Sequence, residues 1–331
     1  MRDEFQPRQL CALAVTALTA PLALVCAGVS WPWVLLGLAL AGAFFLYYIC
    51  AGRKIASRVG YAQMVSAAWG PGGPWVLGAY WLWIVLGCGM AAAETVRAFP
   101  ADRAFPLIPL VVLLLAALTA EKGAAVVCRF GATLFFAVAA LLAGALAFGG
   151  GDIHWENLRP AGTPGEAAGV LAVLLVPAAG WFLRDRMQPE RAAWSRWFAA
   201  AAALGTAVSV VTVGALGLAL ARRSENAFWL MSRSISIFGV MERFEAVISA
   251  LLAISACCLL ALLLSAGRAA LCALRPRWEE RTAVRVTAAV AAACIWGAGV
   301  LPGWAWTAGS LLFWGILPVV TLGIVGEKKL K

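Results

Sequence analysis

Residues 246–266, AVISALLAISACCLLALLLSA, form an apolar stretch of sequence without a single charged side chain. A helix needs about 20 mostly apolar residues to cross the hydrocarbon of a bilayer, because only then are its backbone groups satisfied in lipid. This stretch meets that requirement, so it predicts a membrane-spanning helix. The same pattern recurs in both directions along the chain.

The composition extends this prediction to the whole chain. Its 331 residues are 63% hydrophobic and 13% charged, whereas roughly a quarter of the residues of soluble domains are charged. About ten stretches are long and apolar enough to span a bilayer: 9–29, 31–51, 73–96, 104–120, 123–148, 167–185, 195–221, 241–266, 283–301 and 305–325. The sequence therefore predicts an all-α integral membrane protein with ten transmembrane helices, and residues 1–331 as a single transmembrane domain.

The charges predict how the chain sits in the bilayer. The formal net charge is +10, but the basic residues alternate by loop and form no patch with interleaved aromatics, which argues against nucleic-acid binding. Most of them fall on the side of the two termini, so both termini are predicted to be cytoplasmic. Arg222 and Arg223 fall on the opposite side. Asp3 and Glu4 before the first stretch favour a retained helix over a cleaved signal peptide.

Two interior prolines stand in corresponding spans. Thr19-Ala20-Pro21 lies in the first span and Pro177-Ala178-Ala179-Gly180 lies in the sixth. An interior proline removes a helical hydrogen bond and clashes with the preceding turn, so each site predicts a break. Paired broken helices are typical of the binding site in transporters built from inverted repeats. We therefore expect a five-plus-five inverted repeat, about 9–148 and 167–325, with a solute between broken helices one and six. The alternative is two ordinary prolines, which membrane helices often contain.

Charged residues near the ends of two spans are candidates for gating or coupling. Glu94 lies near the end of the third span, and Glu242, Arg243 and Glu245 open the eighth. Charges at membrane depth mark ion paths or solute contacts. The alternative is a structural role, since acidic residues in the first turn suit the helix dipole and charged side chains at helix ends reach into the headgroups.

A second set of candidates lies deeper in the third span. Tyr80, Trp83 and Gly87 are spaced so that they fall near one face of a helix, which predicts that they line a solute pocket. Lipid-facing packing is the alternative.

The sequence lacks the parts of an enzyme. The single histidine, His154, has no nucleophile or metal motif beside it, and the nine cysteines have no metal-binding spacing. No glycine-rich phosphate loop is present. We therefore expect no catalytic residue, no metal and no cofactor.

Several short motifs point to one family. Arg8-Gln9-Leu10 precedes the proline-containing first span, and Gly123 stands six residues before Arg129. Asn157-Leu158-Arg159-Pro160 precedes the sixth span, and Glu242-Arg243-Phe244-Glu245 opens the eighth. Together these motifs resemble the spore germination permease family, the membrane-embedded B subunit of nutrient germinant receptors, within the amino acid/polyamine/organocation transporter superfamily.

The resemblance implies a five-plus-five inverted repeat, an amino acid or similar nutrient as ligand, and A and C receptor subunits as partners in the spore inner membrane. With this resemblance we hypothesise a zwitterionic solute against spans three and eight, its carboxylate at N–H groups near Ala179-Gly180 and its ammonium at carbonyls near Thr19. One alternative is a proton-coupled secondary amino acid transporter that uses Glu94, Glu242 or Glu245. Another is a structural membrane subunit with a vestigial pocket, because the glycine that the family has before this proline is missing.

Overall fold

The computed structural model describes residues 4–53, 55, 59–98, 107–188, 194–234, 244–297 and 302–327. These residues are almost all helical. In chain order, the α-helices are α1 (Pro7–Cys26), α2 (Trp31–Gly52), α3 (Tyr61–Trp69), α4 (Gly73–Glu94), α5 (Ile108–Glu121), α6 (Ala124–Gly149), α7 (Gly165–Leu175), α8 (Trp194–Leu216), α9 (Leu218–Arg223), α10 (Ala227–Ser234), α11 (Phe244–Leu274), α12 (Glu280–Ile295), α13 (Gly303–Ser310) and α14 (Leu317–Glu327).

Tighter or wider turns link or extend several of these helices. The 3-10 helices are η1 (Gly70–Gly72), η2 (Thr95–Ala98), η3 (Gly150–Asp152), η4 (Trp155–Leu158) and η5 (Val176–Arg186), and η7 (Leu311–Ile316) is a π-helix that joins α13 to α14.

Eight of the helical segments are long and apolar enough to cross a membrane: Pro7–Cys26, Trp31–Gly52, Tyr61–Glu94, Ala124–Asp152, Gly165–Arg186, Ser195–Leu216, Glu245–Leu274 and Gly303–Gly326. They overlap eight of the ten predicted stretches. The other two stretches overlap α5 and α12, which have 14 and 16 residues. The chain thus has the helices of an all-α, multi-pass membrane protein.

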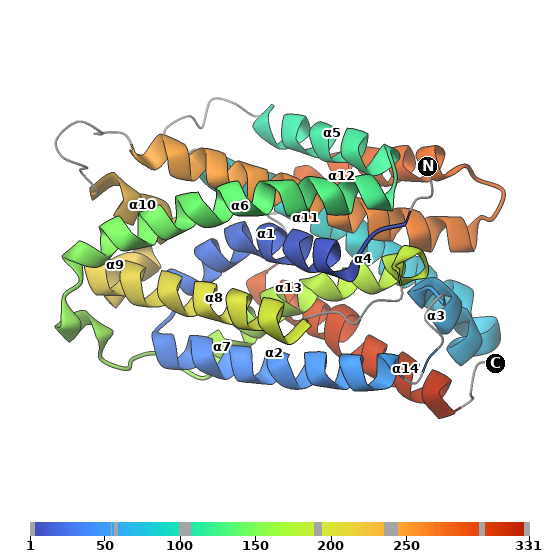
Figure 1. The fold of residues 1–331 in the computed structure, drawn as a ribbon, viewed down its shortest axis with the longest axis horizontal. Coiled ribbons are helices and arrows are strands. Elements are labelled where there is room, and N and C mark those ends of the chain that lie inside the picture. Colours follow the sequence, from blue (N-terminus) through green and yellow to red (C-terminus); the bar gives the residue numbers. More distant parts are fainter. Residues whose placement is uncertain are drawn as a thin grey trace.

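The long helices lie side by side, with α5 and α12 at one edge of the bundle and α2 and α14 at the other (Figure 1). The apolar windows of α1 and α11 are 72% and 78% buried, against 28% for α2 and 22% for α6. The peripheral helices expose large apolar side chains such as Leu46 and Phe136, which is stable against lipid but not against water. Helices α1 and α11 therefore form the centre of the bundle.

Small residues let the central helix approach its neighbours. Helix α1 packs against α6, α8 and α11. A Cβ atom at Gly131 of α6 would lie 2.8 Å from the Cα of Leu13 in α1. Only glycine permits this backbone contact, as is common where membrane helices pack closely.

The predicted break in helix one is wrong: α1 is continuous through Pro21. The Ser255 hydroxyl of α11 accepts a hydrogen bond from the backbone N–H of Ala20 at 2.7 Å and donates to the carbonyl of Thr16 at 2.6 Å. It also lies 3.4 Å from the carbonyl of Ala17, which loses its usual donor because Pro21 has no N–H. The neighbouring helix thus satisfies the backbone that the proline disturbs, and α1 does not need to unwind.

The predicted sixth span is not interrupted at Pro177 but changes there from an α-helix to a 3-10 helix. α7 ends at Leu175 and continues directly as the 3-10 helix η5, whose second residue is Pro177. Because the helix continues, no separate helix amino terminus forms near Ala179 and Gly180. The predicted carboxylate site assumed such a helix end, and binding of a ligand at those N–H groups stays a prediction.

The chain before α1 is tied to the end of η5. The N–H of Phe5 donates to the carbonyl of Arg186 at 3.2 Å, and the N–H of Gln188 donates to the carbonyl of Phe5 at 2.9 Å. The Phe5 side chain is buried. The amino end of α1 and the carboxyl end of α14 lie at the same end of the bundle (Figure 1), which we call the terminal end.

Candidate functional site

A cavity of about 330 Å³ lies between α1, α4, α7, α11 and α13. Five residues selected from the sequence line it: Ala20, Pro21, Trp83, Gly87 and Glu94. The five helices that surround the cavity correspond to the first, third, sixth, eighth and tenth predicted spans. We call it the central cavity, and its size is that of a small-molecule pocket.

Helix α4 presents three of these residues on one face. Gly87 follows Trp83 by four positions and Glu94 follows Gly87 by seven, which are spacings of one helical face. A Cβ atom at Gly87 would meet only the Leu263 side chain, at 3.9 Å. The glycine therefore leaves open space between the tryptophan and the glutamate.

Aromatic side chains form one wall of the central cavity. The rings of Trp83 and Trp306 have centroids 5.1 Å apart, and Phe313 stacks on Trp83 at 5.3 Å. Trp314, on the π-helix η7, also lines the cavity. The hydroxyl of Tyr48 donates to the carbonyls of Trp314 and Gly315, which holds this widened turn in place.

Two carboxylates face the central cavity. Glu94 ends α4, and Glu225 lies between α9 and α10. The next residue, Asn226, accepts a hydrogen bond from the N–H of Trp229 at 3.0 Å at the start of α10. This bond fixes the backbone beside Glu225. The sequence did not identify Glu225, because it sits in a polar segment outside every predicted span.

The remaining predicted binding residues on α1 and η5 do not line the cavity. The hydroxyl of Thr19 is buried and donates to the carbonyl of Val15 in its own helix. Pro177, Ala178, Ala179 and Gly180 lie in η5, and the last three are buried against other helices. Val176, directly before Pro177, lines the cavity in their place.

Of the three charged candidates at the start of the eighth predicted span, the structure describes one. Glu242 and Arg243 lie outside the described residues. Glu245 stands in the first turn of α11 and does not line the central cavity. Their proposed roles in gating or coupling stay predictions.

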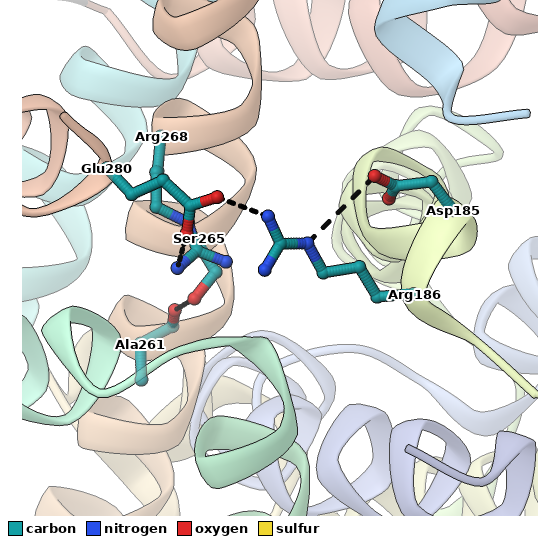
Figure 2. Close-up of polar contacts among 6 residues, drawn as sticks. All are labelled: Asp185, Arg186, Ala261, Ser265, Arg268 and Glu280. Atoms are coloured by element: carbon teal, nitrogen blue, oxygen red, sulfur yellow. Dashed lines mark hydrogen bonds and ion pairs between the residues drawn. The ribbon is translucent and has the colours of Figure 1, made fainter. Parts of the chain in front are cut away.

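A second cavity, of about 760 Å³, lies nearer the terminal end between α3, η5, α11 and the start of α12. Charged residues surround it, and Figure 2 shows Arg186 reaching from η5 toward Glu280. Glu280 also binds Arg268 of α11 at 3.1 Å, although Arg268 is only 4% exposed. Asp185 lies 4.0 Å from Arg186. These four residues form an ionic cluster that joins three helices, and we call this space the terminal cavity.

Tyr80 lies between the two cavities. Its ring centroid is 6.1 Å from that of Trp314, which lines the central cavity, and 5.5 Å from that of Phe182, which lines the terminal cavity. Its hydroxyl lies 2.7 Å from the hydroxyl of Tyr61, and the Tyr80 side chain is fully buried. Tyr80 therefore belongs to an aromatic layer that contacts a lining residue of each cavity.

Comparison with known proteins identified no relative of this chain. No family model matches it, and no curated protein matches it. The resemblance to the germination permeases therefore stays a prediction that rests on short motifs.

Proposed function

We propose that this protein binds a small nutrient solute in the central cavity and acts as a germination permease, the membrane subunit of a nutrient germinant receptor. The observation that carries the proposal is the cavity itself. Pro21 lines it, and so does Val176, the residue before Pro177. One of the two prolines that the sequence singled out thus lines the pocket and the other lies directly beside a lining residue, and the lining helices come from both proposed repeats, as in transporters with inverted repeats.

The proposed membrane topology has ten spans in a five-plus-five inverted repeat. It adds the shorter helices α5 and α12 to the eight long segments. The lining helices support it, because α1 and α4 are the first and third spans of one proposed repeat while α7 and α11 are those of the other. Corresponding helices of the two repeats then contribute to the same cavity.

The proposed orientation puts both termini in the cytoplasm. The ends of the described chain lie at one end of the bundle, as an even number of spans requires (Figure 1). Trp155 of η4 and Trp278, before α12, are both exposed. With single cysteines at these positions in a cysteine-free background, an impermeant thiol reagent should label Trp155→Cys from outside intact cells and leave Trp278→Cys unlabelled. The reverse pattern would refute the orientation.

The proposed ligand is an amino acid, and the proposed setting is the spore inner membrane with A and C subunits as partners. Binding would shift the balance between conformations by the difference in its affinity for them. In this role the protein senses the solute to trigger germination, and net transport is not required.

Ligand-dependent thermal unfolding of the purified protein tests solute binding. A ligand at a hundred times its Kd stabilises the native state by about 2.7 kcal/mol. Gly87→Leu should abolish the shift because the new side chain fills the central cavity. Gly78→Leu is the matched control, since a Cβ atom at Gly78 on the same helix meets nothing within 4 Å.

Either outcome of that measurement is informative. A shift with one amino acid, lost in Gly87→Leu and kept in Gly78→Leu, would support the cavity as the binding site. No shift with amino acids, nucleosides or sugars in a folded sample would favour the structural subunit with a vestigial pocket.

Proton-coupled transport is the second candidate function, and the carboxylate of Glu94 in the central cavity favours it. It predicts amino acid uptake by the protein alone in proteoliposomes with an imposed proton gradient. Glu94→Gln should abolish that uptake. Solute binding without uptake would favour the receptor.

A further inference from the structure

Charged side chains gather where α5 ends and α12 begins, at the terminal end of the bundle. Arg285 of α12 donates to the carboxylate of Glu121, the last residue of α5, through two hydrogen bonds of 2.8 Å and 3.3 Å. The positive charges of Lys122 and Arg281 act on the same carboxylate. Three cationic side chains therefore lie around one glutamate, and we call these four residues the edge cluster.

The edge cluster has an excess of positive charge at an exposed surface. The side chain of Arg285 is 68% exposed, against 16% for Glu121, and the other two cations are exposed as well. Of the two acidic residues that precede Arg281, Glu280 belongs to the ionic cluster and Glu279 is exposed. Even with Glu279 counted, the cations outnumber the carboxylates, so the surface favours a further anion.

The two helices that carry the edge cluster are short. α5 and α12 have 14 and 16 residues, which at 1.5 Å per residue gives lengths of about 21 Å and 24 Å, against about 30 Å of hydrocarbon in a bilayer. They lie next to each other at the edge of the bundle (Figure 1). A bilayer adapts to short helices by thinning locally, which brings lipid headgroups to the level of the edge cluster.

The exposed face of α5 suits the acyl chains of a lipid. Four large apolar side chains on this helix are each at least 50% exposed: Val111, Leu114, Leu115 and Leu118. Their spacings of three and four residues put them in one stripe along the helix, and Lys122 continues the stripe four residues after Leu118. The surface is thus apolar along the helix and cationic at its end, as a phospholipid with a negative headgroup requires.

We propose that the edge cluster binds the headgroup phosphate of an anionic phospholipid, whose acyl chains lie along the exposed stripe of α5. A guanidinium carries five N–H donors, so the two that Arg285 gives to Glu121 leave others for a phosphate oxygen. Basic groups between membrane helices commonly bind anionic headgroups. The inference goes beyond the proposed function: it depends on α5 and α12 lying in the bilayer, and not on a solute in the central cavity.

Matched lipids test the headgroup preference on the wild-type protein. Dioleoylphosphatidylglycerol and dioleoylphosphatidylcholine share their acyl chains and differ in net charge, while sn-glycerol 3-phosphate supplies a phosphate without chains. Native mass spectrometry of the purified protein counts the lipid that stays bound, and thermal unfolding measures the stabilisation. Phosphatidylglycerol should bind at least about tenfold more tightly than phosphatidylcholine, because the choline cation meets the same three basic residues. Glycerol phosphate should have no effect.

A double substitution tests the place of binding. Lys122→Gln combined with Arg281→Gln removes two cations and leaves the ion pair of Arg285 intact, and it should weaken phosphatidylglycerol binding at least about tenfold. Arg159→Gln combined with Arg223→Gln is the control, because it removes the same charge from exposed residues after η4 and at the end of α9, which lies at the opposite end of the bundle (Figure 1). Monodispersity in size-exclusion chromatography checks the folding of both variants.

Each result bears on the edge cluster alone. Phosphatidylglycerol binding that the edge variant loses and the control keeps would support the inference, whether or not any solute binds in the central cavity. Equal retention of the two lipids by the wild type would overturn it, and so would phosphatidylglycerol binding that the edge variant keeps. Stabilisation by glycerol phosphate as large as that by phosphatidylglycerol would make the ligand a free phosphate and would also overturn the lipid site.

Discussion

The hydroxyl of Ser255 bridges the N–H of Ala20 and the carbonyl of Thr16, two groups that bond to each other in a regular α-helix. The bridge lies one residue before Pro21, which lines the central cavity. It therefore ties the backbone beside the central cavity to the centre of α11.

Ser255→Ala should lower the free energy of unfolding by about 1 kcal/mol, because two interhelical hydrogen bonds are lost and each contributes roughly 0.6 kcal/mol in a membrane protein. Equilibrium unfolding in mixed detergent micelles measures this. Ser265→Ala is the matched control, since Ser265 is buried in the same helix but donates only to its own backbone at Ala261. Equal effects of the two substitutions would contradict the bridge.

Gly131→Ala should destabilise the protein by about 1–3 kcal/mol, the range for overpacked cores. The added methyl group meets the backbone of Leu13 at 2.8 Å, so α6 must move away from α1. Gly144→Ala on the same helix is the control, because its Cβ meets nothing within 4 Å and alanine favours a helix. A tolerated alanine at position 131 would show that the two helices are further apart.

Glu280→Gln should cost about 2 kcal/mol, as expected when a charged partner is removed from hydrogen-bonded groups. The buried guanidinium of Arg268 then loses the carboxylate that balances it, and so does Arg186 (Figure 2). Glu121→Gln is the comparison, since its partner Arg285 is 68% exposed and surface ion pairs contribute about 0–1 kcal/mol. Chemical denaturation ranks the two variants, and a larger loss at position 121 would be evidence against the ionic cluster.

Tyr80→Ala should let small solutes cross the protein. The ring separates Trp314 of the central cavity from Phe182 of the terminal cavity, so its removal joins the two spaces. Proteoliposomes with this variant should release trapped choline several-fold faster than the wild type. Tyr47→Ala on the partly exposed face of α2 is the control. Vesicles that retain choline equally well would mean that other side chains close the path.

The sequence predicted the helices well because apolar length is a local property. Eight of the ten predicted spans overlap membrane-length helices, and of the three residues that the periodicity of α4 put on one face, Trp83 and Gly87 line the central cavity. Tyr80 lies on nearly the same face of α4, about one helical turn before Trp83. Its place in a closed aromatic layer depends on Tyr61 and Phe182, which arrive from other helices.

The consequences of the prolines could not be predicted locally. Pro21 leaves α1 intact because Ser255, 235 positions beyond Ala20 in the sequence, reaches its backbone. Pro177 is accommodated by a tighter helix in place of a gap. Glu225 was missed for a similar reason: only the tertiary fold brings the segment between α9 and α10 to the cavity.

The pairing of Phe5 with the segment that leaves η5 makes the amino terminus a reporter for that part of the bundle. Its backbone is bonded to Arg186 on one side and to Gln188 on the other. Any displacement of this end of η5 must carry Phe5 with it or break both hydrogen bonds. A fluorophore attached just ahead of Phe5 would therefore register rearrangement beside the ionic cluster without a label inside the membrane.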